Sequence, residues 1–226
     1  PLRWFLTTVG ADGPSSAAAS LGTLIHAVAE EHPHGTPEEL TEALEALIEE
    51  LGYNLDTWAG RYSDRRARAI VENLASYLVG VPGRVDVEQK VEAQVEGVTI
   101  RGRMDRLEYV DEGVRVTDLK TGSNSDPYRK VDENAQLAAY QLALLASGED
   151  VAGARIALLG TKKKPQTFDQ KPLQGEALAQ WRNKVREVAE SARGPYFEAR
   201  PSDAACAYCS FDRLCPARER GHKVVE

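Results

Sequence analysis

Two neighbouring segments of the sequence place acidic and basic side chains where they could hold a metal ion. Asp105 lies in the first segment, and the second carries Asp118 followed two places later by Lys120. Both segments alternate apolar and polar residues as strands do, and the Asp-Glu-Gly at 111–113 predicts a hairpin turn between them. Asp105 and Asp118 are nearly equidistant from this turn, so we expect their carboxylates to face each other. Strand alternation then puts Lys120 on the same face as Asp118.

This geometry favours a divalent cation site. Two carboxylates about 4 Å apart repel each other by roughly 4 kcal/mol at an effective dielectric near 20, and a cation removes that cost. Two acids and a backbone carbonyl suit Mg²⁺ or Mn²⁺, while a nearby ammonium can position or deprotonate the attacking water. A surface hairpin with an ordinary Asp118–Lys120 pair is the alternative. The apolar residues of 114–121 predict a central strand, where unpaired charge is unfavourable, and so support the metal site.

The elements that must position these residues follow an α/β pattern. Helical spacing extends over residues 16–32, 36–52 and 60–79, and strand alternation over 84–95, 98–110 and 114–121. A helix over 131–146, a buried strand over 154–161 and a long helix over 173–194 come next. Because a strand after a crossover helix tends to lie parallel in the same sheet, we expect a central mixed β-sheet flanked by helices, with a helical N-terminal region.

Composition limits the class of protein. The 226 residues contain no run of about 18 apolar residues and no signal peptide, so we expect a cytoplasmic protein without a membrane partner. The net charge of −7 argues against a general nucleic-acid binder. Basic residues nevertheless cluster at 61–68, 161–165 and 182–186, either as solvated faces or as local contacts to phosphates. Because the chain begins with Pro and an apolar segment, we expect it to be part of a larger polypeptide.

The three cysteines form a separate group near the end of the sequence. Cys206, Cys209 and Cys215 lie within ten residues. An odd number of cysteines without a secretion signal argues against a disulfide framework and favours metal binding. Zinc and an iron–sulfur cluster both fit a C-x₂-C pair with a third cysteine.

Taken in order, these motifs resemble the PD-(D/E)XK nuclease superfamily, specifically its RecB-like branch. "GRMD" and "DLKTG" match the acidic and D-x-K motifs, and "GTLIHAVAE" matches the helical histidine motif. "AQLAAYQLAL" matches the Q-x-x-x-Y motif, and "CAYCSFDRLCP" matches the ending of the iron–sulfur members. The resemblance extends over residues 20–216 and implies a restriction-endonuclease-like α/β fold. It implies one structural domain with a helical part at 1–80, a catalytic core at 81–200 and a Cys-rich clasp at 201–226.

The resemblance also implies a ligand set for the catalytic metal. Mg²⁺ or Mn²⁺ would be held by side chains on two strands and a helix and by one backbone carbonyl: Asp105, Asp118, His26 and the carbonyl of Leu119. Lys120 would orient the attacking water. A core histidine without a ligand role is the alternative for His26.

Four further residues are candidates around this site. Gln136 and Tyr140 lie one helical turn apart and would support the site or contact DNA; a buried hydrogen-bonding pair is the alternative. Glu30 and Glu88 are candidates for acids near the metal, although both have acidic surroundings, where surface roles are commoner.

The resemblance further implies a biological context. The three cysteines would bind a [4Fe–4S] cluster whose fourth, upstream cysteine is absent from this chain; zinc remains the alternative. The activity implied is hydrolysis of DNA, without sequence preference and on single strands, by the nuclease module of a helicase–nuclease that resects double-strand breaks. Actinobacterial AdnAB-type enzymes carry such a module, with the motor in the same chain or in a partner subunit, and would be nucleoid-associated. A catalytically silent module for DNA guidance or subunit assembly, and an unrelated zinc-ribbon protein, are the alternatives.

Overall fold

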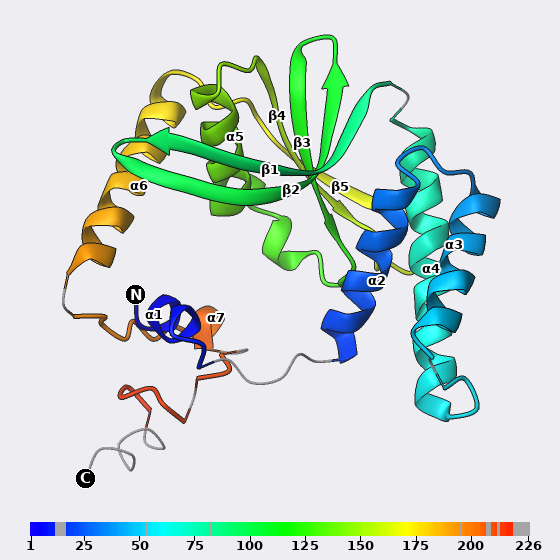
Figure 1. Ribbon diagram of the computed structural model, residues 1–226. Helices are drawn as coiled ribbons and strands as arrows, with labels where there is room; N and C mark the ends of the chain where they lie inside the picture. The colour runs from blue at the N-terminus through cyan, green and yellow to red at the C-terminus, as the bar shows by residue number, and fades with distance from the viewer. Residues whose placement is uncertain are drawn as a thin grey trace. The chain divides into compact units, whose positions relative to one another are not determined.

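The computed structural model describes residues 1–11, 17–52, 54–81, 83–194, 196–206, 209–211 and 213–218 (Figure 1). The chain divides into two compact units. Ala17–Arg182 form one, which we call the sheet unit, and Pro1–Ser16 with Asn183–Glu226 form the other, which we call the terminal unit. All predicted site residues except the cysteines belong to the sheet unit. The predicted boundaries at residues 80 and 200 stay predictions.

The sheet unit contains one five-stranded mixed sheet, as predicted. Its strands lie in the order β1 (Val85–Val95), β2 (Val98–Val110), β3 (Gly113–Lys120), β4 (Val151–Leu158) and β5 (Gln166–Gln170). The β3–β4 pair is parallel and the other pairs are antiparallel. This confirms the parallel crossover expected from the helix between β3 and β4. The predicted strand over 154–161 begins and ends three residues earlier, and β5 was not predicted.

The β2–β3 hairpin turns where the sequence predicted. The ladder extends from Val110–Gly113 to Arg106–Thr117, so Asp105 and Asp118 come one pair beyond it. Gly113 has φ 127°, and a Cβ there would lie 2.1 Å from the Asp150 carbonyl oxygen. A glycine is therefore required at this corner for both its conformation and its size.

Helices cover both faces of the sheet. Figure 1 shows α2 (Ala17–Glu31), α3 (Pro37–Glu50) and α4 (Trp58–Val79) beside one another, while α5 (Ala135–Ala146) packs against the sheet separately. Leu119 of β3 belongs to the core of α2–α4, whereas Val116 belongs to the core of α5. Since side chains alternate along a strand, Asp118 and Lys120 share the face of Val116.

The helix boundaries follow local capping. Thr36 accepts a hydrogen bond from the Glu39 N–H (3.2 Å) and Glu39 accepts one from the Thr36 N–H (2.8 Å), which makes a capping box before Pro37. The helix predicted from residue 131 begins as α5 at Ala135, because Asn134 caps it after the short 3₁₀ helix Val131–Glu133. The predicted long helix is α6 (Gly175–Arg193).

The terminal unit contributes two short helices, α1 (Leu2–Thr8) and α7 (Asp203–Cys206), and a ring stack between Phe5 and Phe197 with centroids 4.6 Å apart. Residues 207, 208, 212 and 219–226 of the predicted Cys-rich tail lie outside the described residues. Within the described ranges, no helix combines the length and apolar character needed to cross a membrane.

Candidate active site

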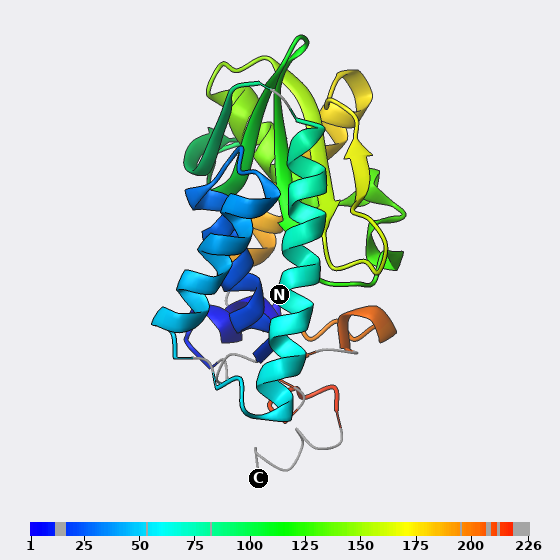
Figure 2. The same cartoon turned by 90° about the vertical axis from the view of Figure 1, so that its right-hand side faces the viewer.

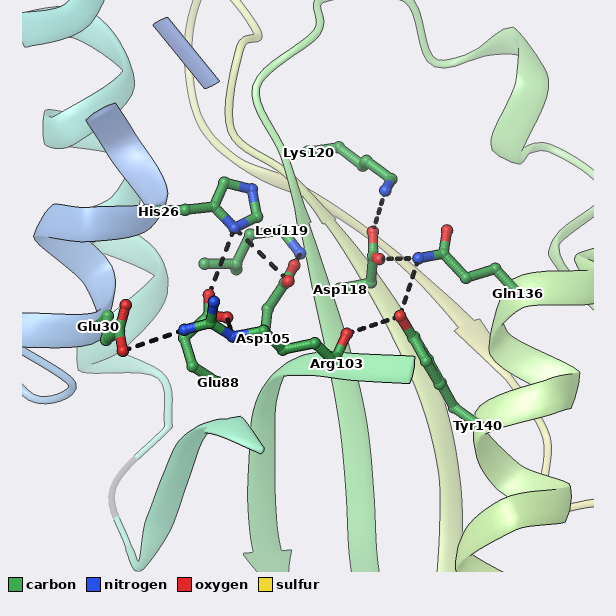
Figure 3. A network of polar contacts seen from close by, with 10 residues as sticks. All are labelled: His26, Glu30, Glu88, Arg103, Asp105, Asp118, Leu119, Lys120, Gln136 and Tyr140. Carbon is green, nitrogen blue, oxygen red and sulfur yellow. Dashed lines mark hydrogen bonds and ion pairs between the residues drawn. The ribbon is translucent and has the colours of Figure 1, made fainter. Parts of the chain in front are cut away.

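The two predicted catalytic carboxylates project from neighbouring strands (Figure 3). Asp105 Oδ2 accepts a hydrogen bond from the backbone N–H of Leu119 at 2.7 Å, which fixes the carboxylate of β2 onto β3. Asp118, the residue before Leu119, is only 2% exposed. The hairpin register therefore brings both acids to the same end of the sheet, as the sequence predicted.

Asp118 is held from two sides. Lys120 Nζ lies 2.6 Å from Asp118 Oδ2, and Gln136 Nε2 donates to Oδ1 at 2.8 Å. Burial raises the pKa of the Asp118 carboxyl above its ordinary value, although the Lys120 ammonium opposes this change. Oδ2 is buried and accepts no hydrogen bond of good angular geometry, so its contact with Lys120 is a pairing of charges. This oxygen therefore keeps lone-pair capacity for a cation.

Lys120 remains an ammonium in this environment. Burial lowers the pKa of Lys120, but the negative charge of Asp118 at 2.6 Å outweighs that effect and raises the pKa above its usual range. A lysine with a raised pKa keeps its proton near neutral pH, so it acts as a fixed positive charge and a hydrogen-bond donor and is a poor general base. The geometry therefore favours electrostatic positioning over deprotonation of the water.

α2 places His26 beside these strands. Ile25 and Val28 of α2 are buried in the helical core, while the His26 side chain keeps 29% of its surface exposed. Its Nδ1 lies 3.5 Å from Asp105 Oδ1 and 3.8 Å from Glu88 Oε1. The hydrogen bond to Asp105 raises the pKa of His26, against the lowering effect of burial, and Glu88 adds to the rise. His26 thus faces the acids and is not an ordinary core histidine.

Glu88 joins the site through an irregular strand position. Its neighbours pair as Val87–Arg106 and Gln89–Met104, which places Glu88 across from Asp105. Glu88 has φ 50°, an uncommon conformation for a residue with a side chain. Burial raises the pKa of Glu88. The sequence offered Glu88 only as a candidate. The feature that could have identified it is the pairing of β1 with β2, which places Glu88 across from Asp105.

Arg103 was not anticipated from the sequence. Its Nε lies 2.5 Å from Glu88 Oε2, and its Nη2 lies 3.3 Å from Glu30 Oε1. Glu30 therefore reaches the site through Arg103, while Glu88 contacts both Arg103 and His26. The signal available in the sequence was the position of Arg103 two residues before Asp105 on the same strand.

His26, Glu88 and Asp105 form a group that fits a divalent cation. Their ligand atoms all lie within 4.8 Å of one another. They border a cavity of about 430 Å³ whose lining is Gly22, Thr23, His26, Ala27, Glu30, Glu88, Arg103 and Asp105. Carboxylate oxygens suit Mg²⁺ and Mn²⁺, and an imidazole nitrogen is accepted more readily by Mn²⁺. The predicted ligand Asp118 is not one of these three; its Oδ2 lies against Lys120 on the adjacent strand, and Glu88 completes the group instead.

α5 ties the two acidic strands together. Gln136 Nε2 also donates to the Tyr140 hydroxyl at 3.2 Å, and this hydroxyl donates to the Arg103 carbonyl at 2.7 Å. A Cβ at Gly102 would lie 2.9 Å from the Tyr140 ring, so the glycine leaves room for it. Gln136 and Tyr140 therefore share one helix face and bridge β3 to β2; contact of this pair with DNA stays a prediction.

The cysteines are described within the terminal unit only. Cys206, Cys209 and Cys215 are half-buried and form no disulfide, and the Cys209 N–H donates to the Cys206 carbonyl at 3.3 Å. Binding of a cluster or of zinc by these three residues stays a prediction.

Comparison with known proteins adds a family. Gene 69 protein of Mycobacterium phage D29 is 26% identical over 234 residues, which cover 86% of this chain and 83% of that protein. The crystal structure of SSO0001 has a TM-score of 0.45 at 17% identity and covers 87% of this chain and 96% of the other. A candidate exonuclease of Eubacterium rectale has a TM-score of 0.48 at 13% identity and covers 87% and 81%. Both TM-scores lie below 0.5, so neither structure bears on what this chain does.

A family model described as the PD-(D/E)XK nuclease superfamily matches residues 1–216, nearly the whole chain. The mixed five-stranded sheet flanked by helices agrees with the restriction-endonuclease-like fold of that superfamily. With the D-x-K motif at the end of β3 and the partner acid on β2, the chain belongs to the PD-(D/E)XK nuclease superfamily.

Proposed function

We propose that this protein is a Mg²⁺- or Mn²⁺-dependent deoxyribonuclease that hydrolyses phosphodiester bonds. One observation carries the proposal. Asp118 of β3 lies between the Lys120 ammonium and Gln136, and Asp105 of β2 accepts a hydrogen bond from the backbone N–H of Leu119, the residue after Asp118. Burial of an acid is unfavourable, so packing does not explain this cluster of charged side chains at the end of a strand. Binding of a metal ion and a phosphate explains it.

The side chains then have separate tasks. His26, Asp105, Asp118 and the Leu119 carbonyl would hold the cation, with Glu88 beside them. When bound, a divalent cation polarises the phosphoryl oxygen and lowers the pKa of a water. Lys120, kept protonated by Asp118, would stabilise the negative charge that grows on the phosphoryl group as water adds and the P–O bond breaks. Gln136 donates to Oδ1 of Asp118 and so fixes the orientation of this carboxylate.

The finer assignment rests on the motifs. The order of the helical His, the two acidic strands, Q-x-x-x-Y and the cysteines supports the RecB-like iron–sulfur type, with exonuclease action on single-stranded DNA. In this proposal Cys206, Cys209 and Cys215 bind a [4Fe–4S] cluster with a fourth cysteine outside this chain. The parent assembly is a helicase–nuclease of the AdnAB type in double-strand-break resection, with its motor in the same chain or in a partner subunit. Such an assembly would act on DNA in the nucleoid.

The test is cleavage of linear single-stranded DNA with Mn²⁺ by the wild type and by the Asp118→Asn and Asp118→Ala variants, with an EDTA control. A matched control is Glu92→Gln, which removes an exposed acid of β1 that pairs with Arg101. We expect metal-dependent cleavage that both Asp118 variants lose and Glu92→Gln keeps. A folded wild type that leaves DNA intact, even when extended at its N-terminus, would contradict the proposal and favour a silent guidance module.

Purification without oxygen tests the cluster separately. Iron and sulfide analysis should give stoichiometric cluster in an N-terminally extended protein and loss of cluster in Cys209→Ser. Stoichiometric zinc instead of iron would show that the cysteines bind zinc and would contradict the proposed cluster.

A further inference from the structure

Two large aromatic side chains are exposed at the start of α4. Trp58 is 71% exposed and Tyr62 is 51% exposed. Their rings stack with centroids 5.6 Å apart and planes 14° apart. Single exposed apolar residues are common, but an ordered pair of flat aromatic faces in solvent indicates a binding surface.

The turn before α4 holds this pair in place. Thr57 caps the helix by accepting from the Gly60 N–H at 3.0 Å and donates to the Asn54 carbonyl at 3.0 Å. Arg61 Nη1 donates to the Asp56 carbonyl at 2.6 Å. A Cβ at Gly60 would lie 1.9 Å from the Asn54 carbonyl oxygen, so the turn packs directly onto the first turn of the helix. The aromatic pair is therefore presented by a fixed backbone, which lowers the cost of binding.

Two exposed arginines lie beside the rings, and the exposed Asp56 precedes them in the turn. Arg61 and Arg65 occupy the same turns of α4 and are exposed. Arg68, one turn further on, is instead neutralised by Asp64 and Glu45 at 3.0 and 2.7 Å. Stacked rings next to arginines match the bases and phosphates of a single strand, the combination that binds single-stranded nucleic acid without sequence preference.

The aromatic pair lies on the same face of α4 as Arg66, which contacts the residue after Lys120. Trp58, Tyr62 and Arg66 recur every four residues and lie on one face of α4. Arg66 Nη2 donates to the Thr121 carbonyl at 3.5 Å, and Thr121 directly follows Lys120. A helix rises 1.5 Å per residue, so Trp58 and Arg66 are about 12 Å apart along the axis, roughly three stacked bases. Figure 2 shows α4 as one long uninterrupted helix beside the sheet.

We infer that Trp58, Tyr62, Arg61 and Arg65 form a stacking site for single-stranded DNA, which holds the strand a few nucleotides from the bond at Lys120. The inference rests on the proposed function, because it places the strand whose phosphate the active site would receive. Two bases stack on the rings, and the neighbouring phosphates meet the arginines.

Binding without cleavage tests this site. An oligothymidylate is titrated in Ca²⁺ or EDTA while tryptophan fluorescence and anisotropy of a labelled strand are followed. Because each base loses its stacking partner, Trp58→Ala and Tyr62→Ala should each weaken binding about tenfold. Trp58→Phe and Tyr62→Phe retain a flat ring and should bind within about twofold of the wild type. Val79→Ala removes an exposed apolar side chain at the other end of α4 and should change nothing.

The outcomes separate this inference from the proposed function. Wild-type binding that both alanine variants preserve, or absence of binding by the wild type, would overturn the stacking site. The bases of a blunt duplex are paired and cannot stack on the rings. If the alanine variants lost as much affinity for blunt duplex as for the single strand, the stacking site would also be overturned. Aromatic-dependent binding by a protein that never cleaves would support the stacking site and contradict the nuclease proposal. Thermal unfolding of each variant is the control for folding, and we expect both alanine variants to unfold cooperatively like the wild type.

Discussion

The contact between Lys120 and Asp118 determines which proton-transfer roles are open to each side chain. The 2.6 Å pair raises the pKa of Lys120 despite its burial, so the lysine acts as a positive charge. Asp118 shares its carboxylate between the lysine and Gln136, and the metal would be its third partner. In the proposed mechanism, Lys120 would therefore assist the reaction and also compete with the metal for Asp118.

Replacing Lys120 by Met should separate these two effects. We expect cleavage to fall by roughly 10²–10³-fold, the range for loss of one charge-stabilising donor. Affinity for Mn²⁺ should stay equal or increase, because a competing ammonium is removed. Cleavage kinetics and calorimetric titration with Mn²⁺ measure both, with exposed Lys90→Met as the control. A parallel loss of metal affinity would show that Lys120 supports the ligands themselves.

Glu88 is predicted to matter for metal affinity. One of its carboxylate oxygens lies within 4.8 Å of the ligand atoms of His26 and Asp105, and Arg103 contacts the carboxylate. Glu88→Gln should weaken Mn²⁺ binding by about 10–100-fold, as loss of a ligand or of its immediate support does. Calorimetry without DNA measures this, and Glu92→Gln on the same strand should bind Mn²⁺ normally. Unchanged affinity in Glu88→Gln would restrict its role to holding Arg103.

His26 should make stability depend on pH in opposite ways with and without metal. Its pKa is raised above 6.5 by the hydrogen bond to Asp105, so in metal-free protein its contribution is fully present below pH 6.5 and is lost as pH rises through the raised value. The Tm difference between wild type and His26→Gln should therefore be larger below pH 6.5 than at mildly alkaline pH. With Mn²⁺ the trend should reverse, because protons compete with the cation for the imidazole. The same trend in both conditions would contradict a ligand role.

At the scale of elements, the corner between β2 and β3 is the most sensitive backbone position. Gly113 combines φ 127° with a Cβ position 2.1 Å from the Asp150 carbonyl oxygen. Gly113→Ala should lower the free energy of unfolding by more than the about 1–3 kcal/mol of backbone strain alone, because the clash adds to it. Urea denaturation measures the change. Gly122→Ala, where a Cβ would meet open space, should be nearly neutral, and equal stability of both variants would contradict the close approach.

Periodicity made much of this architecture predictable. The helices α2 to α4 and the hairpin of β2 and β3 follow clear 3.6- and 2-residue patterns, so Asp105, Asp118 and Lys120 could be brought together from the sequence. β5 was missed because Gln166–Gln170 carries only one apolar residue. α1 was missed because no side chain caps its start.

The parts of the site that escaped prediction depend on backbone irregularity and on tertiary contacts. The alternation of β1 does not reveal that Glu88 adopts φ 50°, which turns an apparent surface acid toward His26. Arg103 gains its place only from carboxylates on β1 and α2, far away in the sequence. Local patterns do not encode such pairings.

For the whole molecule, the net charge of −7 limits nonspecific attraction to DNA, so a few local cations must provide it. If Arg61, Arg65 and Lys120 contact phosphates, the slope of log affinity against log salt should be about −2 for single strands. Fluorescence titrations from low to moderate salt measure this slope, and Arg65→Gln should reduce its magnitude by just under one. A slope of −6 or steeper would indicate a much larger basic surface than the one inferred.

The site joins α2 to α5, and this has a consequence for synthesis of the protein. His26 and Tyr140 are more than a hundred residues apart, and Asp118 depends on Gln136 for one of its two contacts. At roughly 5 to 20 residues per second, a ribosome needs roughly 6 to 23 s between these two residues. An unfinished chain therefore has both acids but lacks the Gln136 contact to Asp118. If the protein cleaves DNA as proposed, a chain that ends before α5 lacks this contact for good, so we expect such a fragment to be inactive.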